Sequence, residues 1–561
     1  MSAADPYAPL PPPVWEKFPR AVPAAAVGLT TALLTYFMFP QPGAADAGGV
    51  AGYAFAVPAI FWAYRRPSFK LFAWTMFAAQ SVAWIAVLAW LRHVTWVGLF
   101  LLGPLVGAWV GIWYLAVWWA MPRILGQPHG IRILGQVGLA GLWVVCEWTR
   151  TRFITGFPWL PLAATQWRLP VILQIASVTG AYGVSFVLIV FNVGIGAYAH
   201  RLFFESATGF NRRSQEFWVA LFALICCLCF FLHDGPMGGK REPLARVALI
   251  QPDIPQSEKW DAAEARRILQ TLYQLSSVAG QVQPDFMLWP ESALPVVIDL
   301  RGPSEGQQIV DSVVKHVGAP LLFGAVATDD TRWYDAAFVA TPKNGLQSAY
   351  YAKRHLVPFG EYVPWHWLFG WVKKVVPIGE DCTPGPALPD PLRMPLRNSP
   401  ATISLAPLVC YEDVFPDLAR VSVRAGADAL VVVTNDAWYG EENAAYQHAA
   451  HSVLRAVETR RPVIRDGNAG WSGWIDEFGN FSMGDEDRPR RTTVMAKDGN
   501  VYFRGTQTIP VMRDARWVGR QTFYVRYGDW FVFLSAALAV FGFWIVRTPV
   551  TVKKRPAADL L

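Results

Sequence analysis

Three short motifs in the second half of the chain carry side chains that can catalyse acyl transfer. Glu291 lies in a Pro-framed turn after an apolar stretch, Lys353 follows two tyrosines and precedes a Pro/Gly turn, and Cys410 ends an apolar stretch before acidic residues. A carboxylate can act as general base, a lysine can stabilise a developing oxyanion, and a cysteine can form a thioester. Together they supply the groups that acyl transfer through a thioester needs.

Each of these residues also has an ordinary interpretation when it is considered alone. Glu291 is then a helix N-terminal carboxylate, Lys353 a surface lysine and Cys410 a buried structural cysteine. The combination favours catalysis, because the three residues end different strands of one domain. A cysteine at a strand-to-helix turn is also exposed to substrate and near helix N–H groups that favour a thiolate. We therefore expect Cys410 to be an accessible thiolate.

The stretch 240–529 has the composition of a normal globular domain, in which short β-rich segments alternate with helix-like ones. Predicted strands are Arg246–Ile250, Phe286–Leu288, Pro320–Phe323, Ala336–Ala340, Ile403–Leu408, Ala429–Val433, Pro462–Asp466 and Gly473–Ile475. Predicted helices cover 260–280, 304–317, 415–425 and 443–460. This order indicates a layered α/β domain, whose functional residues cluster in loops at strand ends.

The rest of the chain is typical of a membrane protein. Of the 561 residues 53% are hydrophobic and only 16% are charged, against roughly 25% charged in soluble domains. A helix needs around 20 mostly apolar residues to span the hydrocarbon core. We predict eight spans, near 21–40, 48–64, 71–91, 98–120, 131–149, 171–197, 216–233 and 529–547.

The distribution of Lys and Arg predicts the orientation of these spans, because short cytoplasmic loops retain positive charge. With eight spans, one side holds Lys17, Arg20, Arg65, Arg66, Lys70, Arg123, Arg132, Arg201, Arg212, Arg213, Arg547 and Lys553–Arg555. Both termini are then cytoplasmic, the first span is the export signal, and the globular domain lies outside the cytoplasm. The domains are predicted as 1–234 with seven helices, 240–522, and 523–561 with the last helix and a cytoplasmic tail.

The loop 150–168 is the exception to this charge pattern. Its arginines, Arg150, Arg152 and Arg168, face outward beside the run 156–160, which we expect to lie at the membrane interface. They either contact lipid phosphates or anchor helix ends. The net charge of +7 is explained by the cytoplasmic loops, so we expect no nucleic-acid partner. The sequence contains no zinc-type cysteine pairing and no Walker-type loop, and we expect neither a metal nor a cofactor.

The motifs and their surroundings resemble a known family. Glu291, Lys353 and Cys410, in this order, resemble the Glu-Lys-Cys triad of the nitrilase superfamily. A nitrilase-like domain placed before the last of about eight membrane helices resembles the bacterial apolipoprotein N-acyltransferases. The resemblance covers essentially the whole chain. Further strings that carry it are Gln251–Gln256, Lys259-Trp260, Thr434–Gly440, Tyr524 and Arg526–Trp530.

This resemblance implies an αββα sandwich for the exported domain and a role for individual residues. Cys410 is the nucleophile, Glu291 the general base, and Lys353 stabilises the oxyanion together with the backbone N–H after the cysteine. Glu361 matches a second essential carboxylate, which positions Lys353 or the reacting carbonyl. The other pocket residues that match are Trp260, Tyr411 and Glu412, for which packing and capping are alternative roles.

The resemblance also implies a reaction and its partners. The thiolate attacks an ester of a membrane phospholipid, and the resulting thioester acylates the α-amine of the diacylglyceryl-cysteine of an apolipoprotein, the last step of lipoprotein maturation. The enzyme is then a multi-pass protein of the bacterial inner membrane with a periplasmic catalytic domain. We expect the aromatic segment Trp365–Trp371 to enter the outer leaflet as a lid, with core packing as its alternative.

Two other functions remain open at this stage. A membrane-anchored amidase would use the same triad on a small extracytoplasmic amide, and a transporter or receptor would only bind ligand there. Three strings depart from the family pattern and bear on pocket shape, namely Tyr334-Asp335-Ala336, Ala163–Gln166 and Asn468-Ala469-Gly470. A disulfide between Cys382 and Cys410 would remove the nucleophile, so we predict two free thiols.

Overall fold

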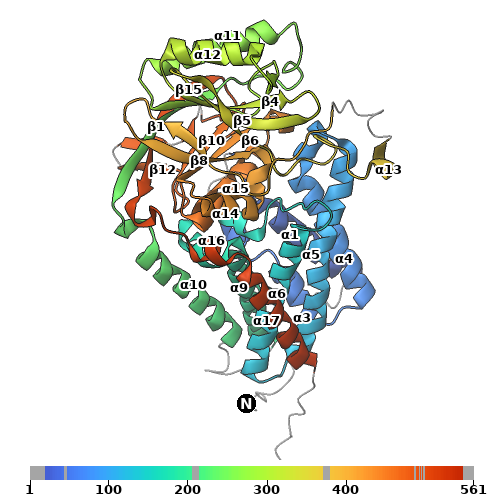
Figure 1. Ribbon diagram of the computed structural model, residues 1–561. Coiled ribbons are helices and arrows are strands. Elements are labelled where there is room, and N and C mark those ends of the chain that lie inside the picture. Colours follow the sequence, from blue (N-terminus) through green and yellow to red (C-terminus); the bar gives the residue numbers. More distant parts are fainter. Residues whose placement is uncertain are drawn as a thin grey trace, which may run out of the picture.

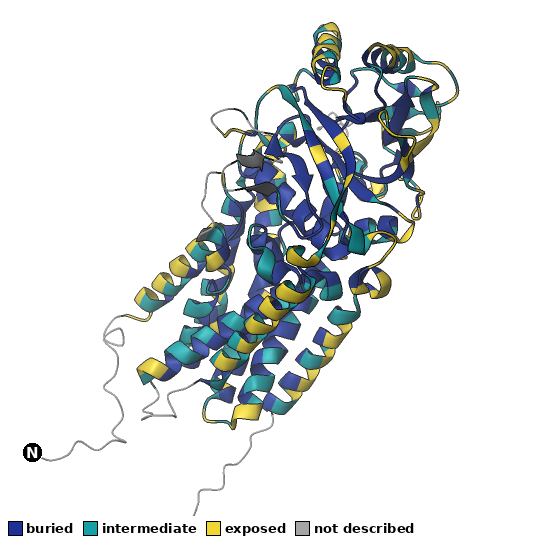
Figure 2. Cartoon of the chain, turned by 90° about the vertical axis from the view of Figure 1, so that its left-hand side faces the viewer, coloured by how far each residue is buried: buried dark blue, intermediate teal, exposed yellow. Residues whose placement is uncertain are grey.

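The computed structural model describes residues 19–42, 47–204, 214–370, 380–485, 488–491, 493–494, 496 and 499–547. A bundle of apolar helices carries a sandwich of two sheets (Figure 1). Many positions on the outer faces of the bundle are exposed (Figure 2), and large apolar side chains are among them, as expected of surfaces that face lipid. Examples on four different helices are Trp74, Leu101, Phe222 and Phe533, each at least 67% exposed.

Six of the described helices are long and apolar enough to cross a membrane. They are α4 (Phe69–Val87), α5 (Trp96–Ile124), α6 (His129–Arg150), α9 (Ala181–Phe204), α10 (Gln215–Asp234) and α17 (Trp530–Arg547). The first predicted span forms α1 (Ala21–Phe37), whose 17 residues extend about 26 Å. A polytopic helical membrane domain is therefore confirmed, and the last helix α17 packs mainly against α6.

The predicted span 48–64 is not one continuous helix. Two short helices, α2 (Ala47–Ala51) and α3 (Val57–Tyr64), are separated by turns. Gly52 lies in the turn, where an added Cβ would be 2.7 Å from the hydroxyl oxygen of Thr165. The sequence prediction missed this break, because every residue in the segment is apolar or small.

The predicted span 171–197 begins ten residues too early. Two single-turn helices, α7 (Pro170–Leu173) and α8 (Ala176–Thr179), come before α9. Gly180 ends α8 with a φ of +68°, a left-handed conformation that glycine adopts readily. The membrane helix therefore starts at Ala181, and the apolar residues before it pack beneath the sandwich instead.

The sandwich consists of two sheets whose central strands are parallel. The first has the order β15-β1-β2-β4-β5-β6, with β3 paired to β4. Its strands are β1 (Arg241–Gln251), β2 (Phe286–Trp289), β3 (Ile298–Asp299), β4 (Leu321–Thr328), β5 (Trp333–Thr341), β6 (Gly345–Ala352) and β15 (Gly505–Asp514). The second has the order β14-β11-β10-β9-β8-β7. Its strands are β7 (Leu392–Pro395), β8 (Thr402–Val409), β9 (Ala429–Thr434), β10 (Val463–Gly467), β11 (Ser472–Ile475) and β14 (Thr493–Val494).

Helices cover both outer faces of the sandwich, which completes the αββα order. The first sheet packs against α11 (Ala265–Gly280) and α12 (Glu305–Val317), and the second against α14 (Pro416–Arg424) and α15 (Ala444–Thr459). A separate apolar core, including Leu249, Leu405 and Val431, fills the space between the sheets. All eight predicted strands and four predicted helices overlap these elements, whereas β3, β6, β7, β14 and β15 were not predicted.

Helix α15 joins the sandwich to the membrane part, and all of its residues are buried. The Gln447 carboxamide oxygen accepts hydrogen bonds from the indole N–H groups of Trp90 at 3.1 Å and Trp159 at 2.9 Å. The His451 Nε2 atom accepts one from the backbone N–H of Leu160 at 3.1 Å. The run 156–160 is thus packed against α15, and the expectation that it lies at the lipid interface is wrong.

The arginines of the same loop are held by protein groups as well. Arg152 forms ion pairs with Asp417 at 2.9 Å and Asp529 at 2.7 Å, and so ties the loop to α14 and to the start of α17. Arg150 is buried and donates a hydrogen bond to the carbonyl of Leu160. These two side chains act as anchors between the membrane part and the sandwich.

Candidate active site

Lys353 is the centre of a buried cluster of charged side chains at one end of the first sheet. It follows β6, and its Nζ atom lies 3.3 Å from Glu291 Oε1 and 3.3 Å from Asp335 Oδ2, and also contacts Glu361 Oε1. Glu291 follows β2, Asp335 lies on β5, and Glu361 accepts a hydrogen bond from the backbone N–H of Val357 at 2.9 Å. The structure therefore brings together three of the predicted residues and adds Asp335.

The electrostatics of this cluster follow from three carboxylates around one ammonium. Burial lowers the pKa of Lys353, but Glu361, Glu291 and Asp335 together raise it well above its ordinary value, so the ammonium stays charged. Burial raises the pKa of Asp335 to about 7, with Lys353 opposing and Glu291 adding to the shift. The carboxylate oxygens of Glu291, Asp335 and Glu361 lie within 4.8 Å of one another, a spacing that suits a cation, and the Lys353 ammonium contacts all three.

A second buried lysine lies next to this cluster. Lys259 donates a hydrogen bond from Nζ to the backbone carbonyl of Glu291 at 2.9 Å. Burial lowers the pKa of Lys259 to about 8, although the charges of Glu291 and Asp335 act in the opposite direction. Lys259 therefore holds the turn that carries Glu291 and adds positive charge near it.

Cys410 directly follows β8 and begins a 3₁₀ helix over Cys410–Val414. Its φ of +50° is left-handed, which is rare for a residue other than glycine and often marks a functional site. Burial and the Glu291 charge raise the pKa of the Cys410 thiol well above its ordinary value, and Lys353 opposes this only in part. The expectation of an accessible thiolate is therefore wrong, because the resting residue is a buried thiol that needs a base.

Glu412 lies behind the catalytic cluster and connects its two halves. Its carboxylate accepts hydrogen bonds from the backbone N–H groups of Val409 at 2.7 Å, Arg354 at 2.7 Å and His355 at 3.2 Å, and from the hydroxyl of Tyr351 at 2.8 Å. The first donor belongs to the strand that ends in the cysteine, and the others flank Lys353. Glu412 is fully buried, and these contacts fit the alternative considered from sequence, a packing and capping role.

Tyr411 and Trp260 do not contact the carboxylate cluster. The ring of Tyr411 stacks on Trp159 with centroids 6.3 Å apart and planes 18° apart, and it packs against Phe415. Tyr411 thus faces the membrane part. Trp260 follows Lys259 in the loop after β1, and its side chain is 50% exposed. Trp260 directly follows Lys259 in the sequence, and Tyr411 directly follows Cys410. Of these neighbours, Lys259 and Cys410 are the ones on which the charges of the cluster act.

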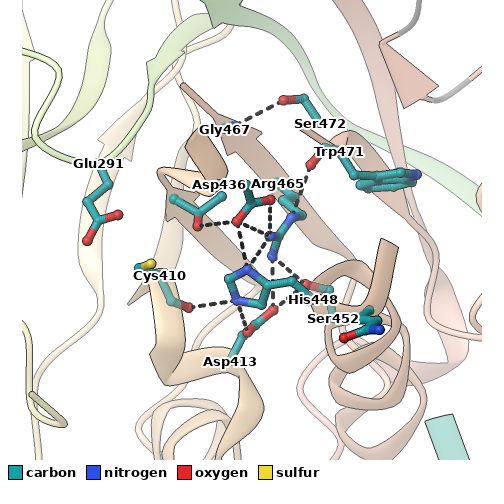
Figure 3. Close-up of polar contacts among 12 residues, drawn as sticks. Glu291, Cys410, Asp413, Asp436, His448, Ser452, Arg465, Gly467, Trp471 and Ser472 are labelled. Atoms are coloured by element: carbon teal, nitrogen blue, oxygen red, sulfur yellow. Dashed lines mark hydrogen bonds and ion pairs between the residues drawn. The ribbon is translucent and has the colours of Figure 1, made fainter. Parts of the chain in front are cut away.

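A second group of charged residues lies behind Cys410 and was not singled out from the sequence (Figure 3). His448 of α15 is flanked by Asp413, 2.8 Å from Nε2, and by Asp436, 2.9 Å from Nδ1. Arg465 of β10 forms ion pairs with the same carboxylates at 3.1 and 3.0 Å. The side chains of all four residues are fully buried. The signals in the sequence are that α15 carries His448 and His451 among apolar residues and that Arg465 follows two apolar residues in β10.

The remaining predictions for this domain are settled in part. Cys382 and Cys410 are both free thiols, as predicted. Of the aromatic segment proposed as a lid, Trp365 is 47% exposed directly before the single-turn helix α13 (His366–Phe369), and Trp367 is 83% exposed within it. Trp371 lies outside the described residues.

The sandwich belongs to a carbon–nitrogen hydrolase domain, since a family model of that description matches residues 246–505, a range that includes Glu291, Lys353 and Cys410. The family model of the apolipoprotein N-acyltransferase N-terminal domain matches residues 31–194. An apolipoprotein N-acyltransferase of Geobacter metallireducens is 31% identical over 94% of this chain and 95% of its own, and one of Allorhizobium ampelinum is 31% identical over 78% and 86%. The chain belongs to the apolipoprotein N-acyltransferase family.

Among solved structures, an amidase from Nesterenkonia sp. aligns with 49% of this chain and 94% of its own. Its identity is 16% and the TM-score is 0.34.

Proposed function

We propose that this apolipoprotein N-acyltransferase moves an acyl chain from a membrane phospholipid to the α-amine of a diacylglyceryl-cysteine, through a thioester on Cys410. The observation that carries the residue assignment is the contact of Lys353 with Glu291, Asp335 and Glu361. The Cys410 thiol lies near enough to this cluster that the charges of Glu291 and Lys353 act on its pKa. The proposed acceptors are diacylglyceryl-modified apolipoproteins, and the donor comes from the lipid bilayer.

In the first half-reaction Glu291 accepts the proton of the Cys410 thiol, and the sulfur attacks the ester carbonyl of the phospholipid. The oxyanion is stabilised by the Lys353 ammonium and by the backbone N–H of Tyr411. When the tetrahedral intermediate collapses, Glu291 returns the proton to the leaving alkoxide, and lysophospholipid departs. Glu361 and Asp335 keep Lys353 charged and in place during this step.

In the second half-reaction the α-amine of the apolipoprotein attacks the thioester carbonyl. Glu291 accepts a proton from the amine, the same two donors stabilise the oxyanion, and Cys410 leaves as a thiolate and takes the proton back. The thioester must be kept from water between the steps. Cys410 is 5% exposed and Lys353 is fully buried, which supports this requirement.

The proposed location is the bacterial inner membrane, with both termini in the cytoplasm and the catalytic domain in the periplasm. The positive charge of the loops on one side of the bundle supports this orientation. The exposed Trp365 and Trp367 support the proposal that the segment Trp365–Trp371 enters the outer leaflet.

The test is transfer of a labelled acyl chain from phospholipid to a synthetic diacylglyceryl-cysteine peptide by detergent-purified protein. We expect N-acylated peptide and lysophospholipid in equal amounts, and neither with Cys410→Ala. The alternative, a membrane-anchored amidase, predicts ammonia release from small amides and no peptide product. Amide hydrolysis without transfer would overturn the proposal.

A further inference from the structure

His448 contacts the main chain of the nucleophile. Its Nε2 atom is 3.2 Å from the backbone carbonyl oxygen of Cys410, and 2.8 Å from Asp413 Oδ1. The carbonyl belongs to the residue whose φ is +50°, so the contact lies at the strained position of the loop. Figure 3 shows the imidazole between Cys410, Asp413 and Asp436, on the side of the loop away from Glu291.

The carbonyl of Cys410 and the N–H of Tyr411 are two ends of the same peptide group. In a trans peptide these bonds point in opposite directions within one plane, so a contact that fixes the carbonyl also fixes the N–H. The Tyr411 N–H lies in the first turn of the 3₁₀ helix Cys410–Val414, where N–H groups have no partner within the helix. It is thus available to a ligand oxygen.

The surroundings of His448 keep it positively charged. Burial and Arg465 lower its pKa, but Asp413 and Asp436 raise it, and the pKa of His448 is about 9 overall. The other groups facing the imidazole are the ring of Trp159, 5.5 Å away, and the Arg465 guanidinium, whose Nη2 is 2.8 Å from Nδ1. Two carboxylates and two cations balance in charge, which makes the burial of all four tolerable.

A charged donor on a peptide carbonyl strengthens the hydrogen bonds that the same peptide donates. Hydrogen bonds from ionised donors are about twice as strong as neutral ones, and connected hydrogen bonds polarise one another. An imidazolium on the Cys410 carbonyl therefore makes the Tyr411 N–H a better donor to an oxyanion, besides fixing its direction.

We propose that His448, held between Asp413 and Asp436, is a positioning residue that orients and polarises the Cys410–Tyr411 peptide for oxyanion stabilisation. The inference is based on the proposed roles of Cys410 and the Tyr411 N–H. His448 does not touch substrate and takes no proton from the thiol. Its effect is confined to steps that form a tetrahedral oxyanion.

The test compares two reactions of the same sulfur. Acylation of Cys410 by phospholipid passes through an oxyanion, whereas alkylation by iodoacetamide does not. In His448→Gln we expect single-turnover acylation to fall about 10- to 100-fold, less than the 10²–10³ of a deleted oxyanion donor, because the N–H is retained. Alkylation should change less than about 3-fold, since it needs no such donor.

The matched control is Ser452→Ala on the same helix. Ser452 donates a hydrogen bond to Asp413, and its described contacts do not include the Cys410 carbonyl. We expect both of its rates to stay within about 3-fold of wild type, because the peptide keeps its charged donor. Equal losses in acylation and alkylation in His448→Gln would overturn the inference, as would acylation at the wild-type rate.

A second measurement uses only wild-type protein, so it does not depend on whether a variant folds. In wild type the ratio of the acylation to the alkylation rate should fall as the pH rises through about 9, where His448 loses its charge. A ratio independent of pH would contradict the inference. Wild-type protein that takes up no acyl chain would overturn the proposed function and the inference with it. If wild type is acylated and His448→Gln is acylated at the same rate, the inference alone is overturned.

Discussion

The Glu412 carboxylate accepts a hydrogen bond from the backbone N–H of Arg354 at 2.7 Å, across the two sheets of the sandwich. The same carboxylate accepts another from Val409, directly before the nucleophile, while Arg354 directly follows Lys353. A single buried side chain therefore sets the separation of Cys410 and Lys353, which come from different sheets.

Replacement of Glu412 by Gln should separate the two halves of the site. The amide nitrogen cannot accept the hydrogen bonds that one carboxylate oxygen now accepts, and buried donors left unpaired destabilise by about 1–3 kcal/mol each. We expect Glu412→Gln to lower the free energy of unfolding by about 3 kcal/mol and to reduce acyl transfer strongly. Tyr351→Phe, which removes one of the four hydrogen bonds, should cost only about 1 kcal/mol. Equal effects of the two variants in denaturant titrations would contradict this role.

Asp335 should make the stability of the protein depend on pH. Its folded pKa is about 7, above the roughly 3.9 of an unfolded Asp, so the folded state binds more protons between these values. The loss of folding free energy that the raised pKa causes thus grows as the pH rises and reaches its full value above about 7. Asp335→Asn removes this loss of stability. The melting temperature of the variant should therefore rise relative to that of wild type between pH 5 and pH 8. A constant difference would argue against a raised pKa.

His448 should also lower the stability as the pH rises, but in a higher pH range and through the loss of a stabilising charge. Its folded pKa of about 9 exceeds the unfolded value of roughly 6.5, so its stabilisation is complete below about 6.5 and is lost as the pH rises through 9. We expect the melting temperatures of wild type and Ser452→Ala to fall as the pH is raised from 6.5 to 9.5. His448→Gln should lose less over the same range, and a loss equal to that of wild type would show that other groups cause it.

The exposed Trp367 should matter for substrates in a bilayer and not for the fold. Trp367→Ala removes a side chain that is 83% exposed, so the melting temperature should stay unchanged. Acylation from phospholipid vesicles should fall severalfold, because an interfacial tryptophan is lost, while acylation by a short-chain soluble ester should not change. Leu388→Ala, at a 79% exposed position before β7, is the matched control. An equal loss of acylation with the vesicle donor and the soluble donor would contradict the proposal that this segment is a lid.

The proposed catalytic residues could be singled out from sequence because each lies in a distinctive local motif at the end of an element. Glu291 and Cys410 follow strands buried on both faces, which appear as continuous apolar runs. The strand before Lys353 was missed, because β6 exposes residues in its middle and has no clear alternation. The breaks in the predicted membrane helices at 52–56 and at Gly180 were missed, because apolar composition does not reveal where a helix ends.

Other features depend on contacts that have no local signal. Asp335 was noted only as a departure from a family pattern, and its place beside Lys353 follows from the pairing of β5 with β6. His448 and Arg465 meet Asp413 and Asp436 only because α15 packs on the second sheet. The protonated state of Cys410 follows from burial beneath the assembled domain, which a sequence motif does not show.

The most direct test of the account is the mass of the intact protein after incubation with phospholipid of one acyl composition. We predict that wild type gains the mass of one acyl chain, that the diacylglyceryl-cysteine peptide removes this mass while buffer does not, and that Cys410→Ala gains nothing. An acyl mass that persists in Cys410→Ala, or a transfer to the peptide without any acylated intermediate, would contradict the thioester mechanism.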